Sequence, residues 1–124
     1  MKFERRKILI IDDDRSFLEL LQAYFASHQY EVTCVDTAVK ALAEMREGRF
    51  KVVILDYSMP HVNGDELIAM LQQINPVARF IVVTGMLSED VESKFKGLGY
   101  FAYFEKGQLP FKILEETVLK AFDS

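Results

Sequence analysis

The sequence contains one cysteine, no tryptophan and only three prolines among its 124 residues. The single cysteine, Cys34, cannot form a disulfide within the chain and offers no basis for a metal cluster of cysteines and histidines. Its position in a predicted strand indicates a packing role. Long apolar stretches are missing too, because no run approaches the ~20 residues that a membrane-spanning helix requires. We therefore expect no association with a membrane.

Neither sign of charge is in large excess. The chain has 15 basic and 19 acidic residues, a net charge of −4, and its basic residues are scattered except at Arg5, Arg6 and Lys7. Because contacts to a phosphate backbone need a basic patch, this balance argues against nucleic-acid binding by this domain. The charged N-terminus MKFERRK leads directly into a strand pattern and does not resemble a signal peptide, so a cytoplasmic protein is expected.

The length and the order of patterns predict one domain, residues 1–124, of the α/β class. Short apolar runs alternate with helical patterns, which is typical of a doubly wound parallel sheet built from βαβ units. Four of the runs are almost continuously apolar, as central strands are, whereas residues 31–35 alternate polar and apolar side chains like an edge strand. The five predicted strands are residues 7–11, 31–35, 51–55, 80–83 and 100–104.

Amphipathic patterns predict helices between and after these strands. Gly48 ends the second helix, Pro76 follows the third, and Pro110 begins the fifth. The fourth, near residues 88–96, has few apolar residues in its stripe, so we expect it to be the least firmly held. The apolar stripe of the first helix runs from Phe17 to Phe25 and that of the second from Ala38 to Met45. The third helix follows Asn63–Gly64, the fourth lies near residues 88–96, and the fifth presents apolar residues from Phe111 to Phe122.

Polar residues stand where the predicted strands end. Asp12 and Asp13 follow the first strand, Asp56 the third, Thr84 the fourth, and Lys106, beside Glu105, the fifth. In an open parallel sheet the carboxyl ends of the strands meet at one edge, which is where ligands bind. We therefore expect an acid cluster, a hydroxyl and an amine to converge there.

Clustered carboxylates repel one another and need a cation, and an all-oxygen ligand set with few members favours Mg²⁺, which shares its shell readily with phosphate. Thr84 can then hydrogen-bond a phosphoryl oxygen, and Lys106 can neutralise the remaining charge. The nucleophile predicted is Asp56, because a carboxylate can form an aspartyl phosphate and no Ser–His or Cys–His arrangement is apparent.

Each of these residues also has a purely structural explanation. Asp13 or Asp14 alone would be a helix N-cap, Thr84 alone a strand end, and Lys106 alone a solvated surface amine. Asp14, which precedes an amphipathic run, is best interpreted as the cap of the first helix. It is the coincidence of polar residues at four strand ends that favours a functional site.

Four segments resemble the receiver domain of two-component response regulators, the CheY-like superfamily, in the order and spacing of that family. The resemblance covers essentially the whole chain and implies a flavodoxin-like (βα)5 fold with strand order 2-1-3-4-5. The segments are ILIIDDD (8–14), VVILDYSMPHVNGDEL (52–67), FIVVTG (80–85) and YFAYFEKG (100–107).

The resemblance implies a role for each matching residue. Asp56 matches the phosphoacceptor, and Asp12 and Asp13 match the acidic pair that binds Mg²⁺ together with Asp56. The backbone carbonyl of Ser58 would complete the protein ligands of the metal.

Three further positions match the residues that respond to phosphorylation. Thr84 matches the switch hydroxyl, Lys106 the lysine that pairs with the phosphoryl group, and Tyr103 the aromatic residue whose rotamer reports the state. Phosphorylation would shift an equilibrium at the surface formed by helix four, strand five and helix five. Beyond autocatalytic phosphotransfer and self-dephosphorylation, no enzymatic activity is implied.

The partners implied are a histidine kinase or histidine phosphotransfer protein upstream and an output domain or protein downstream. We expect residues around helix one, such as Arg15, Phe17 and Leu18, to form the surface that selects the kinase. The domain itself is expected to be a monomer or a weak phosphorylation-dependent dimer.

The sequence departs from the family pattern in three places. Gly107 follows Lys106 where most relatives have a proline with a cis bond, and we predict a trans bond here because a cis bond without proline is costly. Ser58 and Met86 stand where relatives often carry groups that orient a hydrolytic water, so we predict slow self-dephosphorylation. Strand five and helix five lack the charges typical of the winged-helix transcription factors, so their symmetric dimer is not expected.

Two other classes of protein remain open at this point. A phosphatase of the haloacid dehalogenase type would use Asp12 and Asp14 as its D-x-D pair, but it would need a further acidic pair and would leave Asp56 without a role. A receiver-like binding module that is never phosphorylated is the second alternative, which the Gly107 departure keeps open.

Overall fold

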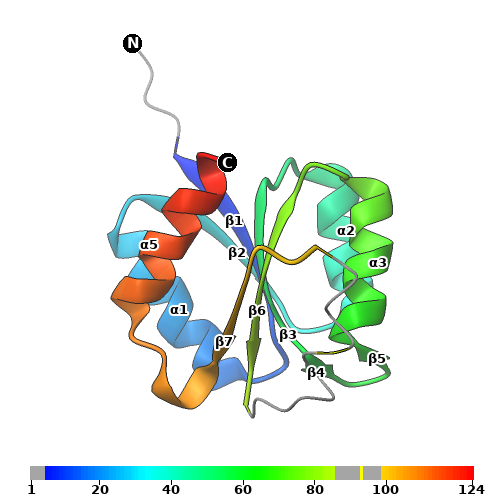
Figure 1. Ribbon diagram of the computed structural model, residues 1–124, viewed down its shortest axis with the longest axis horizontal. Coiled ribbons are helices and arrows are strands. Elements are labelled where there is room, and N and C mark those ends of the chain that lie inside the picture. Colours follow the sequence, from blue (N-terminus) through cyan, green and yellow to red (C-terminus); the bar gives the residue numbers. More distant parts are fainter. Residues whose placement is uncertain (1–4, 86–92, 94–98) are drawn as a thin grey trace.

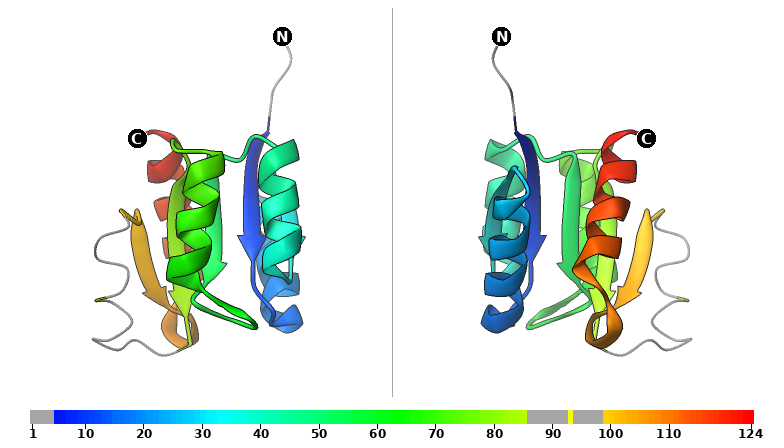
Figure 2. Two further views of the ribbon diagram at one scale, coloured as in Figure 1. Left: turned by 90° about the vertical axis from the view of Figure 1, so that its right-hand side faces the viewer. Right: turned by 90° about the vertical axis from the view of Figure 1, so that its left-hand side faces the viewer.

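The computed structural model describes residues 5–85, 93 and 99–124. Its centre is one parallel sheet, with two helices on each face (Figures 1 and 2). The sheet strands are β1 (Arg6–Ile11), β2 (Tyr30–Val35), β3 (Val52–Asp56), β6 (Arg79–Thr84) and β7 (Ala102–Glu105). The helices are α1 (Arg15–Ser27), α2 (Ala38–Glu47), α3 (Gly64–Ile74) and α5 (Phe111–Phe122). The predicted helix at 88–96 lies outside the described residues, apart from residue 93.

The strands lie in the order β2-β1-β3-β6-β7, and every neighbouring pair is parallel. Counted among the sheet strands alone, this is the order 2-1-3-4-5 of the flavodoxin-like fold, so the predicted fold is confirmed. The strand β2 is an edge strand, as its alternating pattern predicts. The strand β3 is central and buried at all five residues, which explains its unbroken run of apolar side chains.

Alternate side chains of β3 belong to two separate hydrophobic cores. Val53 and Leu55 pack on the face that α2 and α3 cover, whereas Val52 and Ile54 pack on the face of α1 and α5. Successive side chains of a strand point to opposite faces, so a strand covered on both sides must be apolar throughout. The resulting rigid sheet fixes the positions of the residues that follow each strand.

Side-chain caps set the starts of two helices. Asp14 Oδ1 accepts a hydrogen bond of 3.2 Å from the backbone N–H of Phe17, so the predicted N-cap of α1 is confirmed. Thr37 caps α2 in the same way through the N–H of Lys40. Pro110, the predicted first residue of the fifth helix, is the N-cap residue of α5, so this helix begins one residue later than predicted.

Three features of the loops differ from, or add to, the predicted elements. A short antiparallel ladder of β4 (Ser58–Met59) and β5 (Val62–Asn63) follows β3, and no pattern indicated it. Residues 100 and 101, predicted as strand, precede β7, and a 3₁₀ turn η1 (Lys106–Gln108) follows it. The Lys106–Gly107 bond is trans as predicted, since no cis peptide bond occurs among the described residues.

Helices that could cross a bilayer were sought in the described part of the chain. None of them combines the length and the apolar character that a membrane span needs.

Candidate functional site

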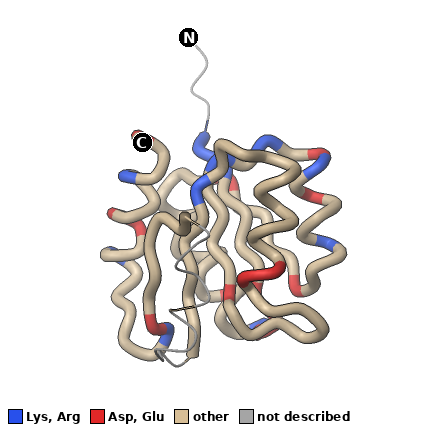
Figure 3. The backbone as a smooth tube through the Cα atoms, turned by 45° about the vertical axis from the view of Figure 1, so that its right-hand side comes forward, with Lys and Arg blue, Asp and Glu red and all other residues tan. Residues whose placement is uncertain are grey.

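The polar residues at the strand ends meet at the carboxyl edge of the sheet. Asp12 directly follows β1, Asp56 ends β3, Thr84 ends β6, and Lys106 directly follows β7. Asp12, Asp56 and Thr84 are the buried polar residues of the described chain, with 0%, 5% and 3% of their surfaces exposed. Figure 3 shows acidic segments at the ends of the central strands and a basic segment after β7. The topology thus brings residues far apart in sequence to one place.

Three carboxylates form the centre of the site. One oxygen from each of Asp12, Asp13 and Asp56 lies within 4.8 Å of the others, and Asp13 is the exposed member. Backbone N–H groups orient the two buried acids, because Asp14 donates to Asp12 Oδ1 at 2.9 Å and Ser58 donates to Asp56 Oδ1 at 3.2 Å. The other oxygen of Asp12, the buried Oδ2, accepts no well-formed hydrogen bond. A small all-oxygen set with a buried carboxylate oxygen that accepts no hydrogen bond fits Mg²⁺.

The ammonium group of Lys106 lies against two of these acids. Its Nζ is 2.8 Å from Asp12 Oδ2 and 3.3 Å from Asp56 Oδ2, and the side chain is 16% exposed. Only the contact with Asp56 has the geometry of a hydrogen bond, so the contact with Asp12 is an ion pair. The same Nζ lies 4.6 Å from the centre of the Phe17 ring. The Lys106 ammonium group therefore contacts two carboxylates and the face of an aromatic ring.

Burial governs the electrostatics of the site. It raises the pKa of Asp12 to about 6, against the opposing effects of Lys106 and of the Asp14 N–H. Burial also raises the pKa of Asp56, which the charge of Lys106 opposes. For Lys106, burial acts to lower the pKa, but contacts with Asp12 and Asp56 outweigh it and the pKa is raised. Ionised acids in this place are costly, so the site favours an additional cation or proton.

The remaining predicted residues border this cluster. Thr84 stands one residue beyond Val83, the β6 partner of Asp56, so the two side chains end neighbouring strands. Tyr103 is half-buried in β7, on the face of the α2 and α3 core, with its ring 5.8 Å from that of Tyr100. The side chain of Ser58 is exposed, while its backbone N–H holds Asp56.

The residues predicted to face the kinase differ in their exposure to solvent. Arg15 has 80% of its side chain exposed, but Phe17 and Leu18 are only 9% and 8% exposed, so their prediction as surface residues is wrong. Both belong to the apolar stripe of α1 that packs on the sheet. Phe17 was therefore missed as a neighbour of the site, although its membership of that stripe already indicated burial.

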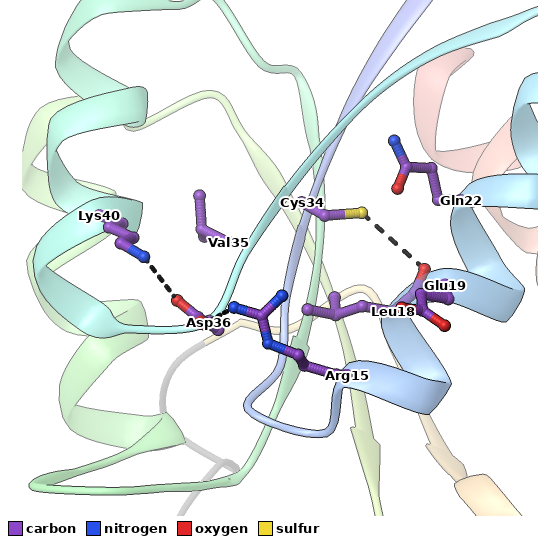
Figure 4. A pocket seen from close by; sticks show the side chains of 8 residues that line it. All are labelled: Arg15, Leu18, Glu19, Gln22, Cys34, Val35, Asp36 and Lys40. Atoms are coloured by element: carbon purple, nitrogen blue, oxygen red, sulfur yellow. Dashed lines mark hydrogen bonds and ion pairs between the residues drawn. The ribbon is translucent and has the colours of Figure 1, made fainter.

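A hollow of about 290 Å³ lies between α1, β2 and α2 (Figure 4). Asp36 forms ion pairs with two cationic side chains that line the hollow, at 3.4 Å from Arg15 and 3.0 Å from Lys40. The thiol of Cys34 lies 4.0 Å from the carbonyl of Leu18, and burial raises its pKa to about 11. The thiol stays protonated near neutral pH, which agrees with the packing role predicted for it.

A flavodoxin-like sheet with three carboxylates and a lysine at its carboxyl edge defines the CheY-like class of signalling domains. The sequence profile of the family described as "Response regulator receiver domain" matches residues 8–117. The chain belongs to this family, whose members serve phosphorelay signal transduction in two-component systems. Neither the dehalogenase-type phosphatase nor the unphosphorylated module is favoured.

Full-length relatives are considerably longer than this chain. A response regulator receiver protein of Anaeromyxobacter sp. is 33% identical over 101 residues, which are 82% of this chain and 42% of that protein. The transcriptional regulatory protein ZraR of Salmonella typhimurium is 31% identical over 114 residues, 92% of this chain and 26% of that protein. The chain thus spans less than half the length of these curated relatives.

Solved structures show the same fold. A CheY-like receiver domain protein from Methanospirillum hungatei is 28% identical, with a TM-score of 0.88 over 97% of this chain and 96% of that one. A response regulator from Burkholderia pseudomallei, solved with a phosphorylated aspartic acid and a calcium ion, is 25% identical, with a TM-score of 0.82 over 95% of this chain and 69% of that one.

Proposed function

We propose that Asp56 accepts a phosphoryl group from the phosphohistidine of a histidine kinase or histidine phosphotransfer protein. The observation that carries this proposal is the Asp56 carboxylate itself, which is almost fully buried at the end of the central strand and lies 3.3 Å from Lys106 Nζ. It also shares a cluster of three acids with Asp12 and Asp13. An acid in this environment is oriented, desolvated and flanked by positive charge, as a nucleophile toward phosphorus needs to be.

The transfer exchanges one bond at phosphorus for another. A carboxylate oxygen of Asp56 forms the new P–O bond, the P–N bond to histidine breaks, and the imidazole leaves with the bonding electron pair and takes up a proton. The Ser58 N–H orients the attacking carboxylate, Thr84 donates its hydroxyl to a phosphoryl oxygen, and Lys106 neutralises developing charge. When bound, Mg²⁺ supplies positive charge shared between the carboxylates and the phosphoryl oxygens.

Asp12, Asp13, Asp56 and the carbonyl of Ser58 are the proposed ligands of Mg²⁺. The mutual distance of the three carboxylates supports this set, as does the Asp12 oxygen that lacks a hydrogen bond. A crystallised relative that holds both a phosphorylated aspartic acid and a calcium ion supports the pairing of the two groups. No reaction other than phosphotransfer and self-dephosphorylation is proposed.

The proposed output is a change of surface at the helix predicted near residues 88–96, at β7 and at α5, controlled by Thr84 and Tyr103. Tyr103 is half-buried and packs against the core of α2 and α3 beside Tyr100, and a change of its rotamer is the proposed signal. The relatives named as transcriptional regulators are far longer than this chain, which supports control of an output domain or a separate partner protein. We propose that the domain acts in the cytoplasm as a monomer or a weak phosphorylation-dependent dimer, and a relative solved as an activated receiver dimer supports the dimeric form.

Intact mass spectrometry after incubation with Mg²⁺ and acetyl phosphate tests this function. The wild-type chain is expected to gain one phosphoryl group, and Asp56→Asn none. Asp12→Asn is the informative control, because it removes a proposed metal ligand and should slow the gain without abolishing the acceptor. An adduct that persists in Asp56→Asn and disappears in Asp12→Asn would place the nucleophile at Asp12 instead and refute the proposal.

A further inference from the structure

Lys106 touches one group that takes no part in the proposed chemistry. Two of its contacts, with Asp12 and Asp56, are to carboxylates that the metal and the phosphoryl group also use. Its third contact is the face of the Phe17 ring, 4.6 Å from Nζ to the ring centre. An ammonium group is attracted to an aromatic face at this distance, and more strongly where water is partly excluded. Phe17 is thus the contact that can persist while the carboxylates bind other groups.

The backbone beside Lys106 provides little restraint of its own. Gly107 follows it directly, and a Cβ built on this glycine would meet no atom within 4 Å. Both residues belong to a single 3₁₀ turn that has no side-chain cap. Glycine loses the most conformational freedom of any residue when it is ordered, so this turn is intrinsically costly to fix. The position of the ammonium group must therefore depend on side-chain contacts.

Phe17, in contrast, is firmly held. Its backbone N–H is bound by the N-cap Asp14, its side chain is only 9% exposed, and its ring packs edge-to-face against Phe111 at 6.4 Å. Phe111 is the first residue of α5 and lies just after the turn that carries Lys106. The ring is thereby held by its place in α1 and by its contact with the first residue of α5.

We propose that Phe17 is a positioning residue for phosphoryl transfer, whose aromatic face holds the Lys106 ammonium group beside Asp56. This inference rests on the proposed function of Lys106, because Phe17 affects the reaction only through that lysine. The Phe17 ring supplies a restraint on the Lys106 ammonium group that the backbone at Gly107 does not provide. Phe17 touches neither the metal ligands' oxygens nor the phosphoryl group in this scheme, so its effect depends entirely on the lysine.

A fluorination series at residue 17 tests this role, because fluorine weakens the negative face of the ring while nearly preserving its shape and apolarity. Phenylalanines with one, two and three fluorines would replace Phe17, and the rate of phosphoryl transfer from acetyl phosphate to Asp56 would be measured at saturating Mg²⁺. We expect the rate to fall stepwise with each fluorine, and Phe17→Leu to be slower by about threefold to tenfold. Saturating Mg²⁺ keeps any change in the affinity for the metal out of the measured rate.

Two controls separate positioning from packing. Trifluorinated phenylalanine at Phe25, which is fully buried in the same core and has aromatic neighbours, should leave the rate unchanged. In a Lys106→Met background, the series at Phe17 should have no effect, because the charge that the ring attracts is gone.

The outcomes distinguish this inference from the proposed function. A wild-type rate in all fluorinated variants, or the same stepwise fall in the Lys106→Met background, would overturn the role of Phe17 and leave the acceptor role of Asp56 intact. A wild-type chain that gains no phosphoryl group on Asp56 would overturn both.

Discussion

Lys106 Nζ lies 2.8 Å from Oδ2 of Asp12, an ion pair that joins the turn after β7 to the end of β1. Two strands, β3 and β6, separate these elements in the sheet. The lysine balances a carboxylate that is completely buried and that has an unusually high pKa. A cation and this lysine use the same oxygen, so metal binding, protonation and the placement of Lys106 are linked at one atom.

The first prediction concerns the pH dependence of stability. Folding raises the pKa of Asp12 from 3.8 to about 6, so the folded state binds more protons between these values. The contribution of Asp12 is therefore most favourable below about pH 4 and is lost as the pH rises through 6. Asp12→Asn should raise the free energy of unfolding at pH 7 by at most about 3 kcal/mol, and by almost nothing near pH 4. Urea unfolding in EDTA measures this difference, with the exposed Asp14→Asn as the matched control. An equal gain at both pH values would contradict it.

The second prediction is that Mg²⁺ stabilises the domain through the acid cluster. An ion that binds the folded chain at a hundredfold excess over its Kd adds about 2.7 kcal/mol to the free energy of unfolding. Asp13→Ala should remove most of this gain, because it deletes the exposed carboxylate of the cluster. Glu47→Ala, which removes another exposed acid at the end of α2, should retain it. Thermal unfolding with and without Mg²⁺ gives the comparison, and equal shifts in both variants would argue against the site.

The third prediction separates Asp14 from its two acidic neighbours. Asp14 Oδ1 caps α1, so Asp14→Ala should reduce the free energy of unfolding by about 1 kcal/mol. Asp14→Ser should restore most of the loss, since serine is also a good N-cap. The Kd for Mg²⁺ should be the same in all three chains. A Kd weakened tenfold by Asp14→Ala would show that this acid belongs to the metal site.

The fourth prediction concerns two glycines with different surroundings. A Cβ on Gly48 would lie 2.4 Å from Cε2 of Phe50, a side chain that is 2% exposed and has little room to shift. Gly48→Ala should therefore cost about 1–3 kcal/mol of stability. Gly107→Ala meets nothing within 4 Å and should change stability by less than about 0.5 kcal/mol. In Phe50→Leu, where the clash is relieved, Gly48→Ala should cost clearly less than it does in the wild type.

The fifth prediction concerns the lifetime of the phosphorylated state. Met86, outside the described residues, can neither donate nor accept a strong hydrogen bond, and Ser58 presents only a short hydroxyl. Without a group that orients water, the phosphoryl group on Asp56 should persist for minutes or longer. Met86→Asn should shorten its half-life, as followed by intact mass in Mg²⁺ buffer. A wild-type half-life of only seconds would refute the prediction.

The sequence alone was sufficient to predict the sheet strands, their alternation with helices and the N-cap at Asp14. These features depend on local information: a strand buried on both faces must be apolar at every residue, and an N-cap needs only the helix that follows it. The edge position of β2 was equally visible, because its polar residues alternate with apolar ones. The residues at the strand ends could be named for the same reason.

Only the tertiary structure decided how those residues meet. The ion pair of Lys106 with Asp12 spans the sheet, and the ladder of β4 and β5 forms between segments too short to show a period. The apolar stripe of α1 indicates that Phe17 is buried, but only the packing of α1, the sheet and α5 places its ring beside Lys106. Periodicity reports which residues are buried, whereas contacts between distant elements depend on how the whole chain packs.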